Sequence, residues 1–155
     1  MSSTPVFVVR HAKAGSRGAW DGPDPARPLS KAGRRQAAGL VGQLGGREIT
    51  RIVSSPYVRC TETVEPLAHR LHLAVEPSPS LEEGASLPEA LRLVEKVADE
   101  PTVLCTHGDV IEELLDHLRR TGVFIDDGRM EKGATWILDT EAGEVTGARY
   151  LPPPS

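Results

Sequence analysis

The sequence lacks a cysteine framework, an excess of basic residues and any long apolar run. Cys60 and Cys105 are too few for a disulfide scaffold, and their spacing matches no zinc site. No apolar run approaches the length needed to cross a membrane. The formal net charge is −4, so no overall basic field favours nucleic acid or a membrane surface as a partner.

The N-terminus also lacks the features of a targeting segment. Met1 to Pro5 carry neither a basic flank nor an apolar core, so we expect no signal peptide and a cytoplasmic location by default. The 155 residues fit one domain, 1–155, that can bury a sizeable core. The sequence indicates no oligomeric state.

Strands and helices alternate along the chain. Apolar runs predict strands at 6–9, 49–53, 73–75 and 101–106, and helical spacing predicts helices at 31–44, 56–71, after Ser86 and at 110–120. Two further runs, at 134–139 and 144–150, predict a final hairpin or edge pair before a frayed tail at 151–155. This order predicts an α/β fold with three layers, α/β/α, around a mostly parallel central sheet.

Local signals indicate where three of the helices begin. Ser30 is a good N-cap, because its hydroxyl can accept from free N–H groups of the first turn. The fixed φ of Pro56 suits the first turn of the next helix. Ser86, with Glu89 three residues later, has the pattern of a capping box.

Polar side chains follow three of the predicted strands. Arg10 and His11 end the first strand, the turn 54–59 follows the second, and His107 follows the strand at 101–106. In open α/β sheets ligands bind beyond the carboxyl ends of the strands. If the three strands are parallel, these residues converge at one edge. Taken alone, the Arg10-His11 pair fits a surface histidine beside a solvated arginine equally well.

Two guanidiniums and two imidazoles in one pocket suit a dianionic, tetrahedral group. Arg10 and Arg59 can bind phosphate through bidentate contacts. His11 or His107 can attack phosphorus and carry the phosphoryl group, which splits one difficult displacement into two. The remaining cations would offset charge on the transferring oxygens.

A leaving alkoxide also needs a proton, for which Glu82 and Glu83 are the candidate donors. No cluster of Asp, His and Glu at metal spacing accompanies these residues, so we expect no metal and no other cofactor. His69 and His72 lie three residues apart and could suggest a metal pair. We expect them instead to be solvated, with His69 favoured by the C-terminal helix dipole.

Four stretches share the order and spacing of known motifs: Arg10-His11-Ala12, Ser54 to Thr63, Thr106-His107-Gly108, and Arg27 to Ala37. The first resembles the Arg-His-Gly signature of the histidine phosphatase superfamily, in its phosphoglycerate-mutase-like branch. The second is similar to that family's Ser-Pro-x-x-Arg-x-x-Gln-Thr stretch, the third to its second-histidine motif and the fourth to its first helix. The resemblance covers nearly the whole chain and implies the histidine-phosphatase fold.

The resemblance implies a role for each matched residue. His11 would be the nucleophile that forms a phosphohistidine. Arg10, Arg59 and His107 would bind the phosphoryl group and neutralise its charge. His107 would also take part in catalysis. Glu83 fits the family's acid position best and would protonate the leaving oxygen, then activate water.

The chain departs from the family pattern at several positions. Ala12 replaces the usual Gly, Glu62 replaces the usual Gln, and Arg17 stands where many members carry Asn. The motif around the acid is short and variable, which keeps Glu82 open as the alternative to Glu83. These departures leave the core chemistry intact but loosen any inference about substrate.

The short chain argues against a mutase. Between Glu83 and His107 there is room for one helix and one strand but no large lid, which a mutase needs to retain its intermediate and exclude water. The chain looks like the small SixA-like phosphohistidine phosphatases. The stretches 54–67 and 81–85 look even more like the phosphatase-like domain fused to some Nudix hydrolases, whose Nudix half is not expected in these 155 residues.

Three functions stay open. The first is a metal-independent phosphatase that hydrolyses a phosphomonoester or phosphohistidine, so its partner is a phosphorylated small molecule, a nucleotide or a phosphoprotein. The second is a nucleotide di- or polyphosphate hydrolase of the same mechanism, and the third is a non-catalytic phosphate-binding module. We expect specificity to lie in the loops 15–28 and 77–87. Lys13 and Arg17 fit either the pocket mouth or a solvated position.

Overall fold

The computed structural model of the chain describes residues 3–154. Met1, Ser2 and Ser155 lie outside the described residues. Met1 and Ser2 belong to the segment in which we expect no signal peptide, and Ser155 ends the expected tail. The strands within 3–154 are β1 (Thr4–Arg10), β2 (Arg51–Ser54), β3 (Val75–Pro77), β4 (Thr102–Thr106), β5 (Phe124–Ile125), β6 (Thr135–Glu141) and β7 (Glu144–Leu151). The α-helices in the same range are α1 (Lys31–Leu44), α2 (Val58–Leu71), α3 (Leu87–Val97) and α4 (Gly108–Arg120). None of these helices is long and apolar enough to cross a membrane.

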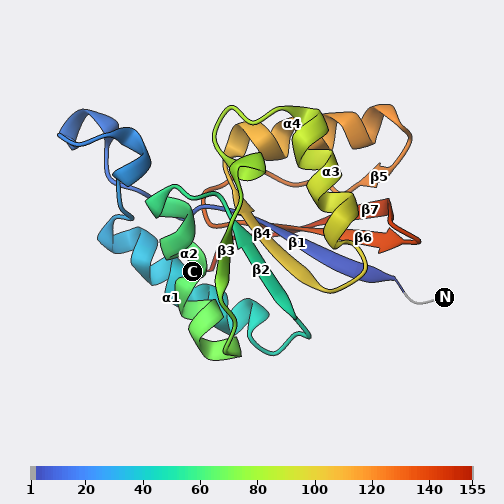
Figure 1. Ribbon diagram of the computed structural model, residues 1–155, viewed down its shortest axis with the longest axis horizontal. Coiled ribbons are helices and arrows are strands. Elements are labelled where there is room, and N and C mark those ends of the chain that lie inside the picture. The colour runs from blue at the N-terminus through green and yellow to red at the C-terminus, as the bar shows by residue number, and fades with distance from the viewer. Residues whose placement is uncertain (1–2, 155) are drawn as a thin grey trace.

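The strands form one sheet in the order β3-β2-β4-β1-β6-β7-β5, with α1 and α2 on one face and α3 and α4 on the other (Figure 1). The pairs β2–β3, β2–β4, β1–β4 and β5–β7 are parallel. β6 is antiparallel to both β1 and β7, and within residues 3–154 it alone runs against the other strands. The predicted α/β/α layers and mostly parallel sheet are therefore confirmed.

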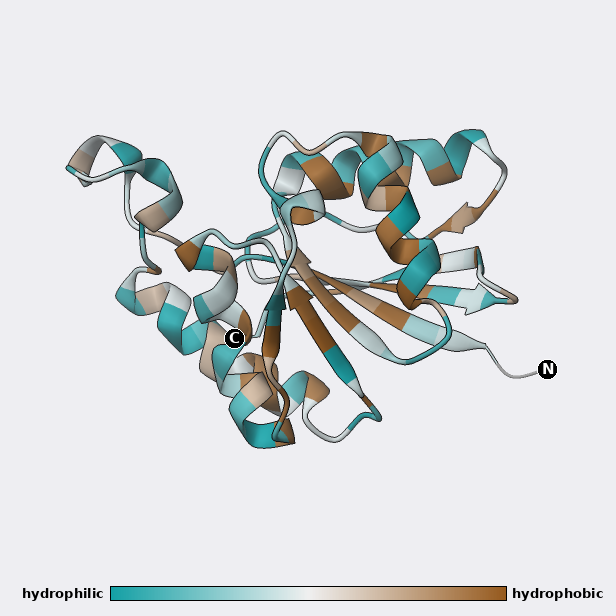
Figure 2. Ribbon diagram, in the orientation of Figure 1, coloured by the Kyte–Doolittle hydropathy of each residue, from teal (hydrophilic) through white to brown (hydrophobic). Residues whose placement is uncertain are grey.

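β1 packs against both helical layers because its apolar residues alternate between the two faces of the sheet. Val6 and Val8 lie in a buried cluster with residues of α3 and α4. Phe7 and Val9 lie in a second cluster with residues of α1 and α2. Hydrophobic residues accordingly concentrate along the central strands (Figure 2). The buried strand holds its C-terminal end, where Arg10 and His11 follow, in a fixed position.

Serine side chains begin α1 and α3 as predicted. The Ser30 hydroxyl accepts from the Gly33 N–H at 3.1 Å, and the Ser86 hydroxyl accepts from the Glu89 N–H at 3.3 Å. The Ser86 hydroxyl also donates to the Glu89 carboxylate at 3.1 Å. Each cap satisfies an N–H group that has no partner within its own helix.

The prediction that Pro56 begins a helix is wrong by two residues. Tyr57 keeps an extended backbone, with φ −60° and ψ 136°, so α2 begins only at Val58. The Tyr57 N–H donates to the Ser55 hydroxyl at 3.3 Å, which holds this extended geometry. Pro56 therefore lies in the turn between β2 and α2.

The strand expected at 73–75 lies two residues later, at Val75–Pro77. The chain leaves α2 through His72, whose φ of 58° is left-handed, and the Leu73 N–H donates back to the Ala68 carbonyl at 2.9 Å. Leu73 therefore caps the C-terminal end of α2 instead of beginning the strand. Val75 is the first residue that pairs with β2.

The C-terminal hairpin of β6 and β7 is confirmed, but it is not at the edge of the sheet. The two-residue strand β5 pairs outside β7. The sequence pattern missed β5 because it is short and Phe124 is 72% exposed. The frayed tail is also a wrong prediction as far as Pro154, because the Pro152 carbonyl accepts from Gln43 of α1 at 2.9 Å and Pro154 packs against Gly39.

Gly33 lets α1 approach the segment that follows β1, and this packing can be tested. A Cβ at Gly33 would lie 1.8 Å from the backbone oxygen of Lys13, so Gly33→Ala should lower the unfolding free energy by about 2 kcal/mol or more. In the same helix, a Cβ at Gly42 meets no atom within 4 Å, and Gly42→Ala should stabilise by roughly 0.5–1 kcal/mol. Urea unfolding followed by circular dichroism measures both changes. A Gly33→Ala variant as stable as the wild type would contradict the packing.

Candidate active site

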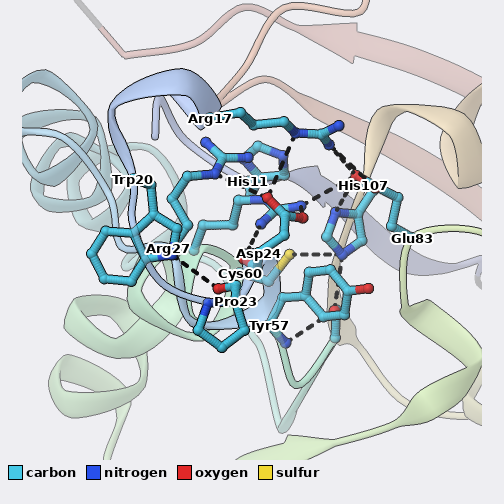
Figure 3. Close-up of polar contacts among 12 residues, drawn as sticks. His11, Arg17, Trp20, Pro23, Asp24, Arg27, Tyr57, Cys60, Glu83 and His107 are labelled. Atoms are coloured by element: carbon cyan, nitrogen blue, oxygen red, sulfur yellow. Dashed lines mark hydrogen bonds and ion pairs between the residues drawn. The ribbon is translucent and has the colours of Figure 1, made fainter. Parts of the chain in front are cut away.

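The carboxyl ends of β1, β4 and β2 bring the residues predicted from the strand ends into one pocket. This pocket has a volume of about 610 Å³, and its lining includes Arg10, His11, Arg59, Glu83 and His107. Its position matches the edge at which open α/β sheets bind ligands. Figure 3 shows most of these side chains and their polar contacts.

His11 lies in the pocket as a neutral imidazole. Its Nδ1 lies 2.8 Å from the Ala12 carbonyl, which can only accept, so Nδ1 carries the proton and Nε2 carries the lone pair. The pKa of His11 is lowered to about 3, mainly by burial and also by the positive charges of Arg59 and Arg10, against the opposing effect of the Ala12 bond. A neutral ring with a free Nε2 is the form in which histidine acts as a nucleophile.

A hydroxyl fixes the orientation of His107. Its Nε2 lies 2.9 Å from the Ser55 hydroxyl and 3.5 Å from the Cys60 sulfur. The Ser55 oxygen also accepts from the Tyr57 N–H at 3.3 Å. The other ring nitrogen, Nδ1, is buried, has no hydrogen-bond partner among the described residues and lies 3.9 Å from the Glu83 carboxylate.

Arg59 is fully buried although its side chain is charged. Its guanidinium donates to the Asp24 carbonyl at 3.0 Å, the Asp24 carboxylate at 3.1 Å and the Glu83 carboxylate at 3.2 Å. The Tyr57 ring lies beneath it, 4.9 Å from the guanidinium carbon. These contacts offset the cost of burying the charge and hold the guanidinium toward the pocket.

Arg10 forms another part of the pocket wall. It donates to the Met130 carbonyl through Nη1, while its buried Nε has no hydrogen-bond partner among residues 3–154. Burial lowers the pKa of Arg10, and the charges of Asp109 and Glu112 oppose this effect. The guanidinium stays a fixed cation beside His11.

The two candidate acids differ in position. Glu83 lines the pocket and accepts from Arg17 Nη2 through both carboxylate oxygens, at 3.0 and 3.2 Å. The next residue, Gly84, donates its N–H to the Asp109 carboxylate at 2.8 Å, which ties this loop to the start of α4. Glu82 is not among the lining residues. The geometry therefore favours Glu83 as the group that can reach a bound phosphoryl.

Sequence reasoning missed Asp24, which holds the arginines of the pocket together. Its carboxylate accepts from Arg27 and from Arg59, both at 3.1 Å, and lies 3.6 Å from Arg17. Burial alone would raise the pKa of Asp24, but the bonds from Arg27 and Arg59 lower it. No local pattern could identify Asp24, because its partner Arg59 is 35 residues away along the chain.

The other predicted residues lie in different places. Arg17 lines the pocket, whereas Lys13 lies outside it. Glu62 accepts from the Leu29 N–H at 2.9 Å and so ties the long loop to α2. His69 and His72 are exposed at the end of α2. Among residues 3–154 no group of three or more His, Cys, Asp or Glu side chains could hold a metal ion.

Sequence comparisons relate the chain to known proteins. The family model of the histidine phosphatase superfamily (branch 1) matches residues 6–86. The 8-oxo-(d)GTP phosphatase of Mycolicibacterium smegmatis is 39% identical over 155 residues, which cover 96% of this chain and 48% of that protein. The chain spans about half the length of the curated relatives it matches.

Solved structures share the fold. The protein histidine phosphatase SixA complexed with tungstate superimposes with a TM-score of 0.73 at 21% identity, covering 98% of this chain and 97% of that one. A mycobacterial glucosyl-3-phosphoglycerate phosphatase with VO3 gives a TM-score of 0.76 at 20% identity, covering 98% and 100%. At sequence identities this low, the structural similarity shows a shared fold and nothing more specific.

The lowered pKa of His11 predicts a neutral ring well below neutral pH. Nitrogen-15 NMR of the imidazoles should show one histidine that stays neutral, with its proton on Nδ1, from pH 7 to about pH 5. The His11→Asn variant assigns the signal by its loss. A His11 ring that is protonated at about pH 6 would contradict the described environment.

The same shift predicts how His11 affects stability. As the pH falls below about 6.5, the unfolded chain binds a proton at His11 that the folded protein does not bind until about pH 3. Acidification within this window should therefore destabilise the wild type more than His11→Asn, by up to about 1.4 kcal/mol per pH unit. Urea unfolding at several pH values measures the difference. Parallel stability curves for the two proteins would rule the shift out.

Proposed function

The chain belongs to the histidine phosphatase superfamily, and from this premise we propose that it is a phosphatase that acts through a phosphohistidine at His11. The observation that supports this most is a neutral imidazole with a free Nε2 inside a pocket lined by Arg10, Arg59 and His107. The substrate is a phosphomonoester or a phosphohistidine, carried by a small molecule, a nucleotide or a protein.

The first step transfers the phosphoryl group to the protein. The phosphoryl oxygens replace carboxylate oxygens on Arg59 and also bind Arg10 and the Nδ1–H of His107, which together offset their charge. His11 Nε2 attacks phosphorus, and the bond from phosphorus to the leaving oxygen breaks. The electron pair stays on that oxygen, which takes a proton from Glu83. Glu83 carries this proton because the phosphoryl oxygens displace its carboxylate from Arg59 and it then takes up the proton of the monoanionic phosphoryl group.

The second step returns the site to its starting state. Glu83, now a carboxylate, takes a proton from water as the water oxygen attacks phosphorus. The bond from phosphorus to His11 Nε2 breaks, its electron pair returns to the imidazole, and inorganic phosphate leaves. Both steps use the same cations, because the transferring group keeps its three equatorial oxygens throughout.

A second candidate is hydrolysis of a nucleotide di- or polyphosphate by the same chemistry. It is favoured by the relative named 8-oxo-(d)GTP phosphatase, of which this chain matches 48%. A non-catalytic phosphate-binding module is the third reading, and the experiments below separate it from both enzymes.

The nucleophile is tested by His11→Asn. Turnover of p-nitrophenyl phosphate, measured with EDTA present, should fall at least about a thousandfold, because the mechanism uses the His11 imidazole as the attacking group. Circular dichroism checks that the variant is folded. Full activity of His11→Asn would rule out the phosphohistidine mechanism, and a wild type that binds phosphate without any turnover would favour the binding module.

The acid is tested by a matched pair, Glu83→Gln and Glu82→Gln. p-Nitrophenolate leaves readily without a proton, so loss of the acid mainly slows attack by water, and a phosphoprotein accumulates. Glu83→Gln should lower kcat about a hundredfold and show an acid-labile phosphate adduct by intact-protein mass spectrometry. Glu82→Gln should stay within about twofold of the wild type. The reverse pattern would make Glu82 the acid.

A further inference from the structure

The pocket holds more cationic side chains than the proposed contacts with one phosphoryl group use. Five guanidinium or ammonium groups line it within residues 3–154, those of Arg10, Arg17, Arg27, Arg59 and Lys132. The carboxylates of the lining are Glu83 and Asp109, and Asp109 already bonds Gly84. Asp24, beside the lining, bonds Arg27 and Arg59. In the proposed mechanism Arg10 and Arg59 hold the reacting phosphoryl. Arg17, Arg27 and Lys132 remain outside that role.

Of these three cations, Arg17 is already paired with a carboxylate, whereas Lys132 has no such partner among the described residues. Arg17 forms two hydrogen bonds to Glu83. Lys132 has no carboxylate within salt-bridge distance among the described residues. Burial lowers the pKa of Lys132. The positive charges of nearby guanidiniums lower it further, those of Arg10 and Arg27 most of all. An ammonium group among guanidiniums is repelled in the free protein, and a bound anion would relieve that repulsion.

Arg27 is also positioned to bind an anion. Its side chain is almost fully buried, and its Nε and Nη1 donate to the Asp24 carboxylate and the Gly15 carbonyl. Its Nη2 has no hydrogen-bond partner among the described residues. The guanidinium is thus held in place by two of its nitrogens while a third stays available in the pocket it lines.

Backbone hydrogen bonds fix Lys132 next to the nucleophile. The Gly133 N–H donates to the carbonyls of both Arg10 and His11 at 3.1 Å, and the Arg10 N–H donates to the Ala134 carbonyl at 2.9 Å. The Lys132 carbonyl itself accepts from Gln36 of α1 at 3.1 Å. Gly133 takes a φ of 87°, which suits glycine and lets the chain make this turn. The position of Lys132 is therefore set by the same strand end that holds His11.

We propose that Lys132 and Arg27 form a second anion subsite beside the reacting phosphoryl, and that this subsite binds the neighbouring phosphate of a phosphoanhydride substrate. This inference rests on the second candidate of the proposed function, hydrolysis of a nucleotide di- or polyphosphate, because the reacting phosphoryl must lie at His11. A pocket of about 610 Å³ lies within the size range of small-molecule sites and has room for more than one phosphate. The substrate class is accordingly a di- or triphosphate ester.

The subsite would also assist the chemistry. When His11 Nε2 attacks the terminal phosphorus, the bond to the bridging oxygen breaks and its electron pair passes to the departing phosphate. Lys132 and Arg27 bind that departing phosphate and stabilise the charge it gains. The histidine then loses its phosphoryl group to water, so the products are inorganic phosphate and the shortened phosphate chain.

Binding measurements test the subsite separately from turnover. Isothermal titration calorimetry in the His11→Asn background compares the affinities for inorganic tripolyphosphate and orthophosphate. Three proteins are measured: the parent with Lys132 intact, Lys132→Gln, and the control Lys96→Gln, which changes an exposed residue of α3. Lys132→Gln should weaken tripolyphosphate at least about tenfold more than orthophosphate. Lys96→Gln should change neither affinity. Equal losses for both anions, or no loss, would overturn the subsite.

Kinetics provide the second readout. With His11 intact, Lys132→Gln should lower the ratio of kcat/KM for a nucleoside triphosphate to that for p-nitrophenyl phosphate about tenfold. An unchanged ratio would overturn the subsite. If the wild type hydrolyses neither substrate, the proposed function fails, and the calorimetry alone decides whether Lys132 binds a second phosphate.

Discussion

The register of three parallel strands is the constraint on which the site depends. β1 pairs with β4 so that Arg10 faces Thr106, and β2 pairs with β4 so that Ser54 faces Cys105. The chain continues this pairing for one step beyond the strands, since the His11 N–H donates to the Thr106 carbonyl at 3.1 Å and the Ser55 N–H to the Cys105 carbonyl at 2.9 Å. His11, His107 and the Ser55 hydroxyl therefore lie at the same level of the sheet edge.

Crowding so many cations at one edge requires two physical compensations. Asp24 and Glu83 place carboxylates on Arg59, which is fully buried and would otherwise carry an unpaired charge. His11 avoids the repulsion by staying neutral, with its pKa lowered to about 3. The neutral state that burial favours is also the state in which a histidine can act as a nucleophile.

Two segments far apart in the sequence add charged side chains around the end of β1. The loop 15–28 carries Arg17, Asp24 and Arg27, and the turn at 130–134 carries Lys132. Both are tied down near the end of β1, the first through the Ser30 N–H to the Lys13 carbonyl at 3.0 Å and the second through Gly133. Differences in substrate between proteins with this fold are expected to arise in such segments, because the sheet edge fixes only the central phosphoryl position.

The sequence by itself determined the order of strands and helices, the bounds of α1 and the residues at the strand ends. These features are local: apolar periodicity, a serine cap and a polar residue after a buried run each act within a few positions. The tertiary structure decided the sheet order, the edge strand β5, the start of α2, the place of Glu83 rather than Glu82 in the pocket, and the contacts of Asp24, Ser55 and Lys132. Those depend on strand register and on hydrogen bonds between residues tens of positions apart, such as Arg59 to Asp24, which leave no periodic trace in the sequence.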